Sequence, residues 1–377
     1  MYLKRKIGSF YSIFSAALSF FNFGESGYRD ICIDVLRSVA IFAVVLVHSL
    51  NYLVNIKSNY YEPFFEMSGF WRFCVPFFLI VSGYFSCRMN KMYFLNFLKK
   101  IVLKILIPFF IATFLSYYIF WGDFNWSIFW QVLLNGRADY GHWFIPLLLE
   151  IYILHFLITR IFKKSYLYVW LILSLISIYF CFNPYTFTQF LFLLAAKFPL
   201  YKSFFVYLNN LFISYTQELA QIQFYLVYFG FGLFLEKVLP YFKKYNYKNL
   251  LTILFLILTV LFGILHYRDF IVDSWVQRFA YFNGYLALYS INFYIFFILI
   301  LGRIRVTNFW ITVSLLGKHS LWVLLFHGIL IKILTSIFFE NGVSENYRLY
   351  VFMLSFVVVG IFLMSFWGLE KVMKIKS

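Results

Sequence analysis

Long apolar runs, separated by short polar stretches, repeat along almost the whole chain of 377 residues. Runs of about 20 apolar residues have the length that an α-helix needs to cross a bilayer. We place ten such spans, at about 31–54, 69–87, 101–121, 143–162, 166–183, 217–236, 249–266, 280–301, 316–337 and 349–368. Because lipid cannot satisfy backbone hydrogen bonds, the pattern predicts an all-α, polytopic membrane helix bundle of about ten transmembrane helices.

The composition supports a membrane protein and argues against a nucleic-acid-binding protein. The chain is 63% hydrophobic and 12% charged, with a mean hydropathy of +0.82, which exceeds the needs of a soluble core. The net charge of +17 would also fit a nucleic-acid-binding protein, but the basic residues divide by side. Apart from Arg37, 22 Lys and Arg residues fall on the side of the two termini and 9 on the other. This bias predicts cytoplasmic termini and attraction to anionic membrane lipids, and we expect no nucleic acid partner.

The N-terminal stretch superficially resembles a signal peptide, because the basic residues Lys4–Lys6 precede a moderately apolar run. Serine and asparagine residues interrupt that run, however, and no small-x-small cleavage site follows. If it were a span, every later loop would change sides and the charge bias would be reversed. The domains that we expect are a cytoplasmic or interfacial segment at 1–30, a single transmembrane domain at 31–370 and a cytoplasmic tail at 371–377.

The region 183–216 has two interpretations. It is apolar, but prolines, lysines and asparagines interrupt it. It is either an outer loop that contains a re-entrant or interfacial helix, or an additional pair of spans. Both interpretations preserve the orientation of the helices that follow.

Four cysteines, Cys32, Cys74, Cys87 and Cys181, are scattered along the chain. None belongs to a Cys-x-x-Cys pair, and each lies in a span or at the end of one. We therefore predict neither a metal site nor a disulfide framework.

Three ionisable residues, Asp34, Arg37 and His48, lie inside the first predicted span. Charged groups at that depth are costly, so they usually face the bundle interior or a wet cavity. His48 follows Arg37 by eleven positions, which puts them about 20° apart around the helix and roughly 16 Å apart along it. Asp34 precedes Arg37 by three residues and shares its side. A cation near one end and an imidazole far along the same side predict a long anionic ligand.

A basic cluster follows the second span directly, and its members are Arg88, Lys91, Lys99, Lys100 and Lys104. Many such clusters only fix membrane topology, and others bind phosphate groups. Both interpretations remain open from the sequence. The second span itself contains Pro76 and the pair Ser82-Gly83, which are typical of a packing notch against a neighbouring helix.

Further polar residues lie in the fourth and ninth spans. Glu150 lies about two turns into the fourth span, so we expect it to be paired, protonated or lining a cavity. His155 lies deeper, and we interpret it as an interior hydrogen-bonded histidine. In the ninth span, the step from His319 to His327 puts the two residues within roughly 80° of the same face.

Four stretches together resemble the acyltransferase 3 family of integral membrane O-acyltransferases. They are Arg37 and His48, which match its Arg-x10-His motif; Val75–Tyr84, which is similar to its Pro-Phe-Phe…Ser-Gly-Tyr span; His142–Pro146 with Glu150 and Tyr152, which are similar to its Trp-Phe-Leu-Pro…Tyr-Leu span; and Leu316–His327, which are similar to its Leu-Gly-Lys-x-Ser-Leu…His element. Their order and spacing cover about residues 30 to 370. His319 departs from the family pattern, which has small polar residues there, and no esterase-like domain is fused.

The resemblance implies transfer of an acyl group, usually acetyl from cytoplasmic acetyl-CoA, to a hydroxyl of a surface polysaccharide or lipid-linked sugar in a bacterial inner membrane. Arg37, with Arg88 and Lys91, would bind the phosphates of the acyl-CoA donor. His48 would be the general base or the nucleophile of an acyl-imidazole. The remaining assignments are Asp34, which would orient Arg37; Glu150, which would help form the site; and His142, Trp143 and His327, which would bind substrate.

Two other functions also fit a basic, aromatic-rich membrane protein. A lipid-linked glycan flippase or transporter would tend to show internal half-repeats and charges spread over many spans, and neither is evident. A glycan polymerase would be expected to carry a large outer loop with several arginines. The outer side of the chain holds only 9 basic residues in total, which counts against that function.

Overall fold

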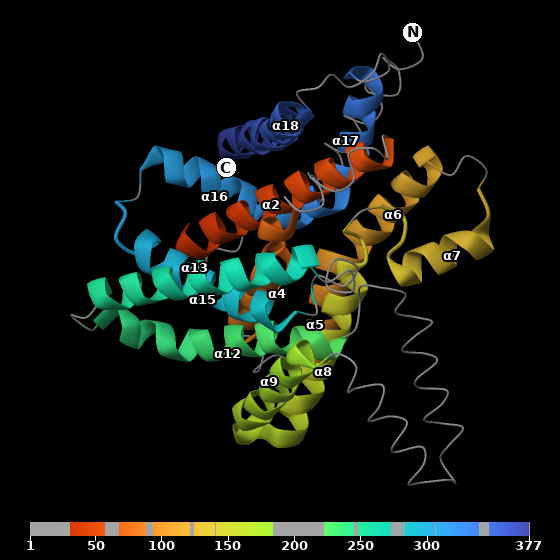
Figure 1. Ribbon diagram of the computed structural model, residues 1–377. Helices are drawn as coiled ribbons and strands as arrows, with labels where there is room; N and C mark the ends of the chain where they lie inside the picture. The colour runs from red at the N-terminus through yellow and green to blue at the C-terminus, as the bar shows by residue number, and fades with distance from the viewer. Residues whose placement is uncertain are drawn as a thin grey trace. The chain divides into compact units, whose positions relative to one another are not determined.

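The computed structural model describes residues 31–56, 68–87, 93–120, 124–139, 141–183, 222–244, 248–272, 281, 283–305, 307–338 and 347–376. The predicted N-terminal segment 1–30 and nearly all of the region 183–216 lie outside these residues. The chain divides into a short unit, Met1–Ile31, and a main unit, Cys32–Ser377, which holds the helix bundle. Within the residues described, every regular element is helical and none is a strand, which confirms the predicted all-α class (Figure 1).

The helices follow the predicted spans closely. They are α2 (Ile31–Ile56), α4 (Cys74–Ser86), α5 (Phe94–Ile101), a π-helical turn (Val102–Leu106), α6 (Ile107–Phe120), α7 (Trp126–Asn135), α8 (Phe144–Phe162), α9 (Tyr166–Phe182), α12 (Ile222–Lys244), α13 (Lys248–Val272), α15 (Gly284–Leu301), α16 (Asn308–Lys318), α17 (Ser320–Phe338) and α18 (Tyr347–Lys376). Nine segments of the described chain are long and apolar enough to cross a membrane. One of them, Phe144–Phe182, comprises α8 and α9, so each of the ten predicted spans has a helical counterpart.

Three details differ from the prediction. The third span begins at Phe94, earlier than expected, so Lys99, Lys100 and Lys104 belong to the helix. The Trp-rich segment before the fourth span contains its own helix, α7, which Asn125 caps through its side chain. The predicted ninth span is two helices, because α16 ends at Lys318 and α17 begins at Ser320.

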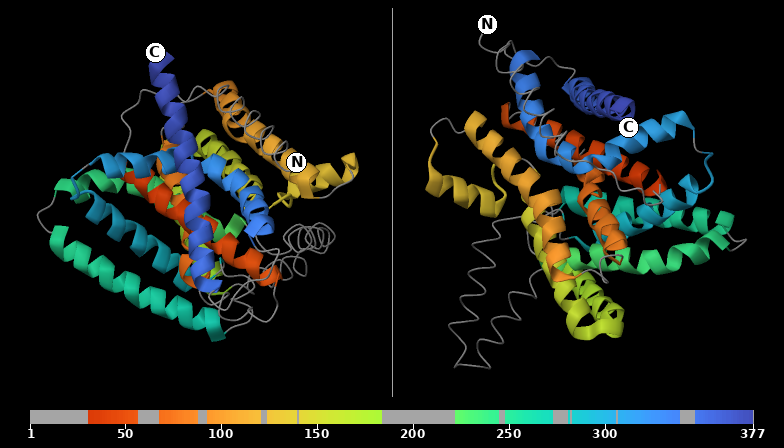
Figure 2. Two further views of the ribbon diagram at one scale, coloured as in Figure 1. Left: turned by 90° about the horizontal axis from the view of Figure 1, so that it is seen from above. Right: turned by 180° about the vertical axis from the view of Figure 1, so that it is seen from behind.

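Burial separates central helices from peripheral ones. In the Ile31–Asn51 segment 67% of the residues are buried inside the protein, against 17% in Asn249–Val272. Both segments are strongly apolar, so the second presents its apolar side chains outward, as a lipid-facing helix does. The interior position of α2, seen in the views of Figure 2, explains why its polar residues face other helices.

Close backbone contacts hold the central helices together. α12 packs against α4 and α9, and α13 packs against α15. At the contact of α4 with α12, a Cβ atom on Gly83 would overlap the carbonyl oxygen of Phe229, and one on Gly232 would overlap that of Ile80. The predicted notch at Ser82-Gly83 is therefore a packing surface, since small residues let membrane helices approach closely.

Candidate active site

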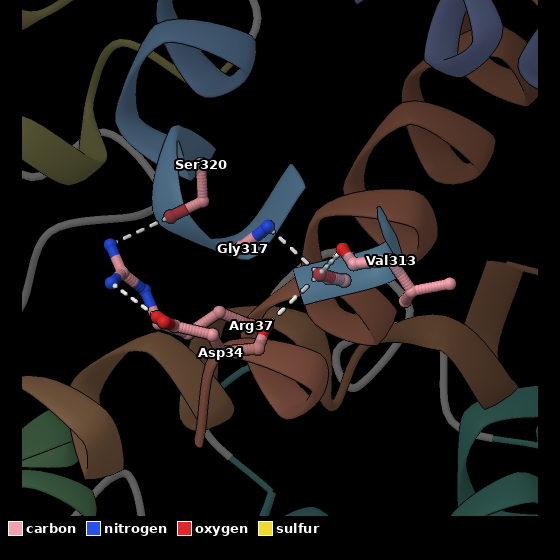
Figure 3. A network of polar contacts seen from close by, with 6 residues as sticks. Asp34, Arg37, Val313, Gly317 and Ser320 are labelled. Carbon is pink, nitrogen blue, oxygen red and sulfur yellow. Dashed lines mark hydrogen bonds and ion pairs between the residues drawn. The ribbon is translucent and has the colours of Figure 1, made fainter. Parts of the chain in front are cut away.

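One end of the candidate site lies at the start of α2, where Arg37 is held by two side chains (Figure 3). Its Nη1 lies 3.4 Å from Oδ1 of Asp34, and its Nη2 donates to Oγ of Ser320, at 2.9 Å. The Asp34 side chain is 4% exposed, whereas that of Arg37 is 24% exposed. Arg37 is thus oriented by a buried carboxylate and still reachable by a ligand.

Ser38 joins this part of α2 to the junction between α16 and α17. Its hydroxyl accepts a hydrogen bond from the Gly317 N–H, at 2.8 Å, and lies 2.6 Å from the Val313 carbonyl oxygen (Figure 3). A Cβ atom on Gly317 would overlap the carbonyl oxygen of Asp34, so the two backbones are in direct contact. This contact fixes the start of α17, and with it Ser320, opposite Arg37.

The other end of the site is formed by His48 of α2 and His327 of α17, whose ring centroids lie 5.0 Å apart. Arg37 and His48 are eleven residues apart on α2, and Ser320 and His327 are seven apart on α17. Both intervals are about 20° from a whole number of helical turns. The same side of α2 therefore contacts the same side of α17 at two levels, as the spacing of Arg37 and His48 predicts.

Two neighbouring histidines are held by backbone carbonyls of α17. Nδ1 of His327 lies 3.0 Å and 2.9 Å from the carbonyl oxygens of Val323 and Leu324, and Nε2 of His142 lies 2.9 Å from that of Leu325. Since a carbonyl oxygen only accepts, each of these nitrogens carries the proton. Both side chains are fully buried. Burial lowers the pKa of His142, which precedes the fourth membrane segment, to about 4.

Gly141 packs against both rings of the His48–His327 pair. Its φ of 83° is in the left-handed region that favours glycine. A Cβ atom here would lie 3.4 Å from Cε1 of His327, 3.7 Å from Nε2 of His48 and 3.3 Å from a methyl carbon of Leu324. The turn that carries Gly141 therefore lies against the His48–His327 pair, and the missing side chain of the glycine leaves space next to the two rings.

A small cavity lies next to His48, with room for about one water molecule. Its lining is mainly apolar and aromatic, and comes from Val44, Val47, His48, Cys74, Val75, Phe78, Gly141, Trp143, Phe144, Tyr281 and Leu324. His48 keeps part of its surface accessible although its ring lies deep in the bundle. An imidazole in such a cavity can exchange a proton with a small polar group that enters.

An ion pair anchors the turn that carries Gly141. Oδ1 of Asp139 lies 3.9 Å from Nζ of Lys332, and the Asp139 carboxylate also rests on the backbone of α17 at Gly328. Nζ of Lys332 lies 3.5 Å from the centroid of the Phe120 ring. Together with the bond from His142, these contacts attach the turn to α17 on either side of Gly141.

Sequence reasoning missed Arg72, Asp139, Lys332 and Tyr281. The Arg72 guanidinium carbon lies 5.3 Å from the centroid of the Tyr281 ring, which lines the cavity, and its charge acts on His48. A signal was available for two of them, because Arg72 and Lys332 lie within predicted spans, where charged residues indicate a functional or paired position. Asp139 lies outside the predicted spans, and Tyr281 lies at the start of the span 280–301 but is uncharged, so neither carries such a signal.

The structure brings together most of the residues predicted for the site. Asp34 and Arg37 lie at one end, and at the other His48 and Trp143 line the cavity, with His327 beside His48 and His142 bonded to α17. Arg88 and Lys91 are outside the described residues.

Glu150 does not join them. Its side chain is exposed on the face of α8 that also exposes Ile153 and Leu157, and it is absent from the cavity lining. Glu150 therefore lies away from this cavity, and its part in forming the site stays a prediction.

His319 also lies apart from His327, contrary to the prediction of a shared face. The helix is interrupted between Lys318 and Ser320, so the periodicity does not carry across His319. Its ring stacks on Phe366 of α18, with centroids 4.4 Å apart. His155, by contrast, is buried against Trp170 and Phe229, in keeping with an interior histidine.

Comparison with known proteins identifies the family of the chain. The model of the acyltransferase domain family, acyltransferase 3, matches residues 30–367, which is nearly the whole chain. No curated protein and no solved structure matched it. The family match includes both ends of the site, from Asp34 to His327, and the chain therefore belongs to the acyltransferase 3 family of membrane acyltransferases.

Proposed function

We propose that the protein transfers an acetyl group from acetyl-CoA to a hydroxyl of a cell-surface or lipid-linked polysaccharide. The observation that carries the proposal is the pair of contacts between α2 and α17, Arg37 with Ser320 at one level and His48 with His327 at the other. An anion-binding group and a proton-transferring group therefore lie about 16 Å apart along one helix. Coenzyme A has the matching form, with phosphates at one end and a thioester at the end of a long arm.

The donor would bind with its phosphates at Arg37. A guanidinium forms charge-assisted, bidentate hydrogen bonds with phosphate oxygens, and Asp34 keeps this one in place. Lys99 and Lys104 are exposed on the third span and add positive charge, and Arg88 and Lys91 belong to the same basic cluster of the sequence. The distribution of basic residues supports a cytoplasmic position for the Arg37 end, with both termini on that side of a bacterial inner membrane.

The chemistry would take place at His48. The acceptor hydroxyl oxygen attacks the thioester carbonyl carbon, so a C–O bond forms and the C–S bond breaks. His48 takes the hydroxyl proton as general base and returns it to the sulfur of coenzyme A. In the alternative route His48 is the nucleophile, and the acetyl group passes through an acyl-imidazole before it reaches the acceptor. The aromatic lining with Trp143 supports binding of the acceptor on this side of His48.

Mass spectrometry of the surface polysaccharide tests the function. Cells that lack the gene should make a polysaccharide of normal length and display without its acetyl groups, and the wild-type gene should restore them. The His48→Ala gene should not restore acetylation, whereas His155→Gln, a matched change of a buried histidine away from the cavity, should. Loss of surface display would indicate a flippase and shortened chains a polymerase, and either result would contradict the proposal.

Labelling of the purified protein distinguishes general-base catalysis from the acyl-imidazole route. Rapid denaturation of the purified protein after mixing with radiolabelled acetyl-CoA should retain label on His48 only if an acyl-imidazole forms. General-base catalysis leaves no label on the protein.

A further inference from the structure

We propose that His327 is the positioning residue of His48, and that its unprotonated Nε2 accepts a hydrogen bond from the His48 ring during proton transfer. The inference rests on the proposed acetyl transfer and assigns a role within it. It arises from the contacts of His327 itself, which differ from those expected of a residue that binds substrate.

The hydrogen bonds of His327 fix its tautomer. Nδ1 lies within 3.0 Å of the carbonyl oxygens of Val323 and Leu324, one turn earlier on α17. These oxygens only accept, so Nδ1 carries the proton and Nε2 of the neutral ring carries a lone pair. His327 can therefore act only as an acceptor at Nε2.

That lone pair is buried. The His327 side chain is fully buried, and within the described part of the chain Nε2 has no hydrogen-bond partner. A buried acceptor without a partner is costly, and a catalytic role is one explanation for such an atom in a native protein. Since Nδ1 turns back onto α17, Nε2 faces away from the backbone that holds the ring.

His48 is the titratable ring next to His327. The two ring centroids are 5.0 Å apart with an interplanar angle of 41°, so the two rings are direct neighbours. His327 is absent from the cavity lining, whereas His48 belongs to it. His327 is thus placed to act through His48, and it does not meet the acceptor directly.

None of the other charged or titratable groups described around His48 and His327 is placed to accept a hydrogen bond from the His48 ring. Arg72 places a positive charge near His48, whereas His142, which lies near His327, is a buried neutral ring. The proton at Nε2 of His142 is held by the Leu325 carbonyl, and Cys74 and Tyr281 complete the polar lining of the cavity. No carboxylate lines the described cavity, and Asp139 is occupied at Lys332 and Gly328.

The role fits the proton balance of the reaction. When His48 takes the hydroxyl proton it becomes an imidazolium, and its second N–H donates to Nε2 of His327. As the C–S bond breaks, His48 gives the first proton to the sulfur, and both rings return to their starting forms. A neutral acceptor stabilises the imidazolium without holding the proton as strongly as a carboxylate would.

Two variants of similar size separate this role from a structural one. His327→Gln places an amide oxygen near the position of Nε2, whereas His327→Asn retains only a polar group near Nδ1. The assay uses purified protein, acetyl-CoA and polysaccharide from cells that lack the gene. His319→Asn, at a buried histidine stacked on Phe366, is the matched control.

We expect His327→Asn to lower kcat roughly 10- to 100-fold, the effect of losing one hydrogen bond to a charged group. His327→Gln should recover most of that loss, and coenzyme A should bind all three variants as tightly as it binds the wild type. Equal rates for the Gln and Asn variants, or a loss of coenzyme A binding that matches the loss of rate, would overturn the proposal. Failure of the proposed function gives a different result, because the wild-type protein would then transfer no acetyl group.

Discussion

The two ends of α2 differ in what surrounds their polar residues. At the first end, Arg37 has 24% of its side chain exposed and contacts a carboxylate and a hydroxyl. At the second end, His48 lies deep in the bundle, with the buried rings of His142 and His327 nearby. One end is suited to hold a charged ligand that arrives from water, and the other to exchange a proton where water is scarce.

This difference shows how a single helix can serve two tasks. Because α2 and α17 are in contact at both levels, helix geometry sets the distance between Arg37 and His48, and side-chain motion changes it little. Changes at the His48 end should therefore affect transfer, and changes at the Arg37 end should affect binding of the donor.

The largest effect is expected from His48→Ala. Removing a general base or nucleophile should lower acetyl transfer roughly 100- to 10,000-fold. Binding of coenzyme A, measured by titration calorimetry, should stay within a few-fold of the wild type, because Arg37 and its partners are untouched. Unchanged acetyl transfer by the His48→Ala variant would contradict the assignment of proton transfer to the His48 end of α2.

A pH titration tests the burial of the second end. The folded protein keeps His142 neutral down to about pH 4, whereas the unfolded chain takes up the proton near pH 6.5. This contribution to the free energy of unfolding is complete above pH 6.5 and is lost as the pH falls towards 4, by about 3 kcal/mol in all. Thermal unfolding in detergent should show the loss, and His142→Gln should reduce the slope. A His142→Gln profile as steep as that of the wild type would contradict the burial of a neutral ring.

Arg37→Ala should weaken coenzyme A binding roughly 10- to 100-fold, because one charge-assisted contact is removed. Arg37→Lys should recover only part of the affinity, since an ammonium group cannot make the bidentate contact. Arg303→Ala is the matched control, because the Arg303 side chain is exposed and donates a hydrogen bond to Oγ1 of Thr252, away from Arg37. If both alanine variants weaken binding equally, general electrostatic attraction and not a defined site explains the affinity.

The smallest effect is expected from Gly141→Ala. The left-handed backbone disfavours a side chain by about 1–2 kcal/mol, and the new Cβ would press on His327 and His48. We expect a lower melting temperature and slower transfer, with coenzyme A binding unchanged. Gly360→Ala serves as the control, since a Cβ there has no neighbour within 4 Å. The same result from both variants would show that Gly141 has no special position beside the pair.

The sequence was informative where periodicity alone fixes position. The ten spans are predictable because the bilayer sets their length, and the shared side of Arg37 and His48 follows from helical geometry. Glu150 shows the limit, because its depth in a span does not reveal which face of α8 points outward.

Contacts between distant elements could not be predicted. The break at His319 interrupts a helix that hydropathy shows as continuous, and it places His319 against Phe366. The ion pair of Asp139 with Lys332 and the position of Gly141 depend on how the turn meets α17. Such contacts belong to tertiary packing, and one sequence contains no periodic signal for them.

The most direct test of the central claim is a structure of the protein with coenzyme A bound. The account predicts that the phosphates contact Arg37 and that the arm follows the contact between α2 and α17, with its sulfur in the cavity at His48. A coenzyme A molecule bound away from Arg37, or with its sulfur distant from His48, would contradict the account.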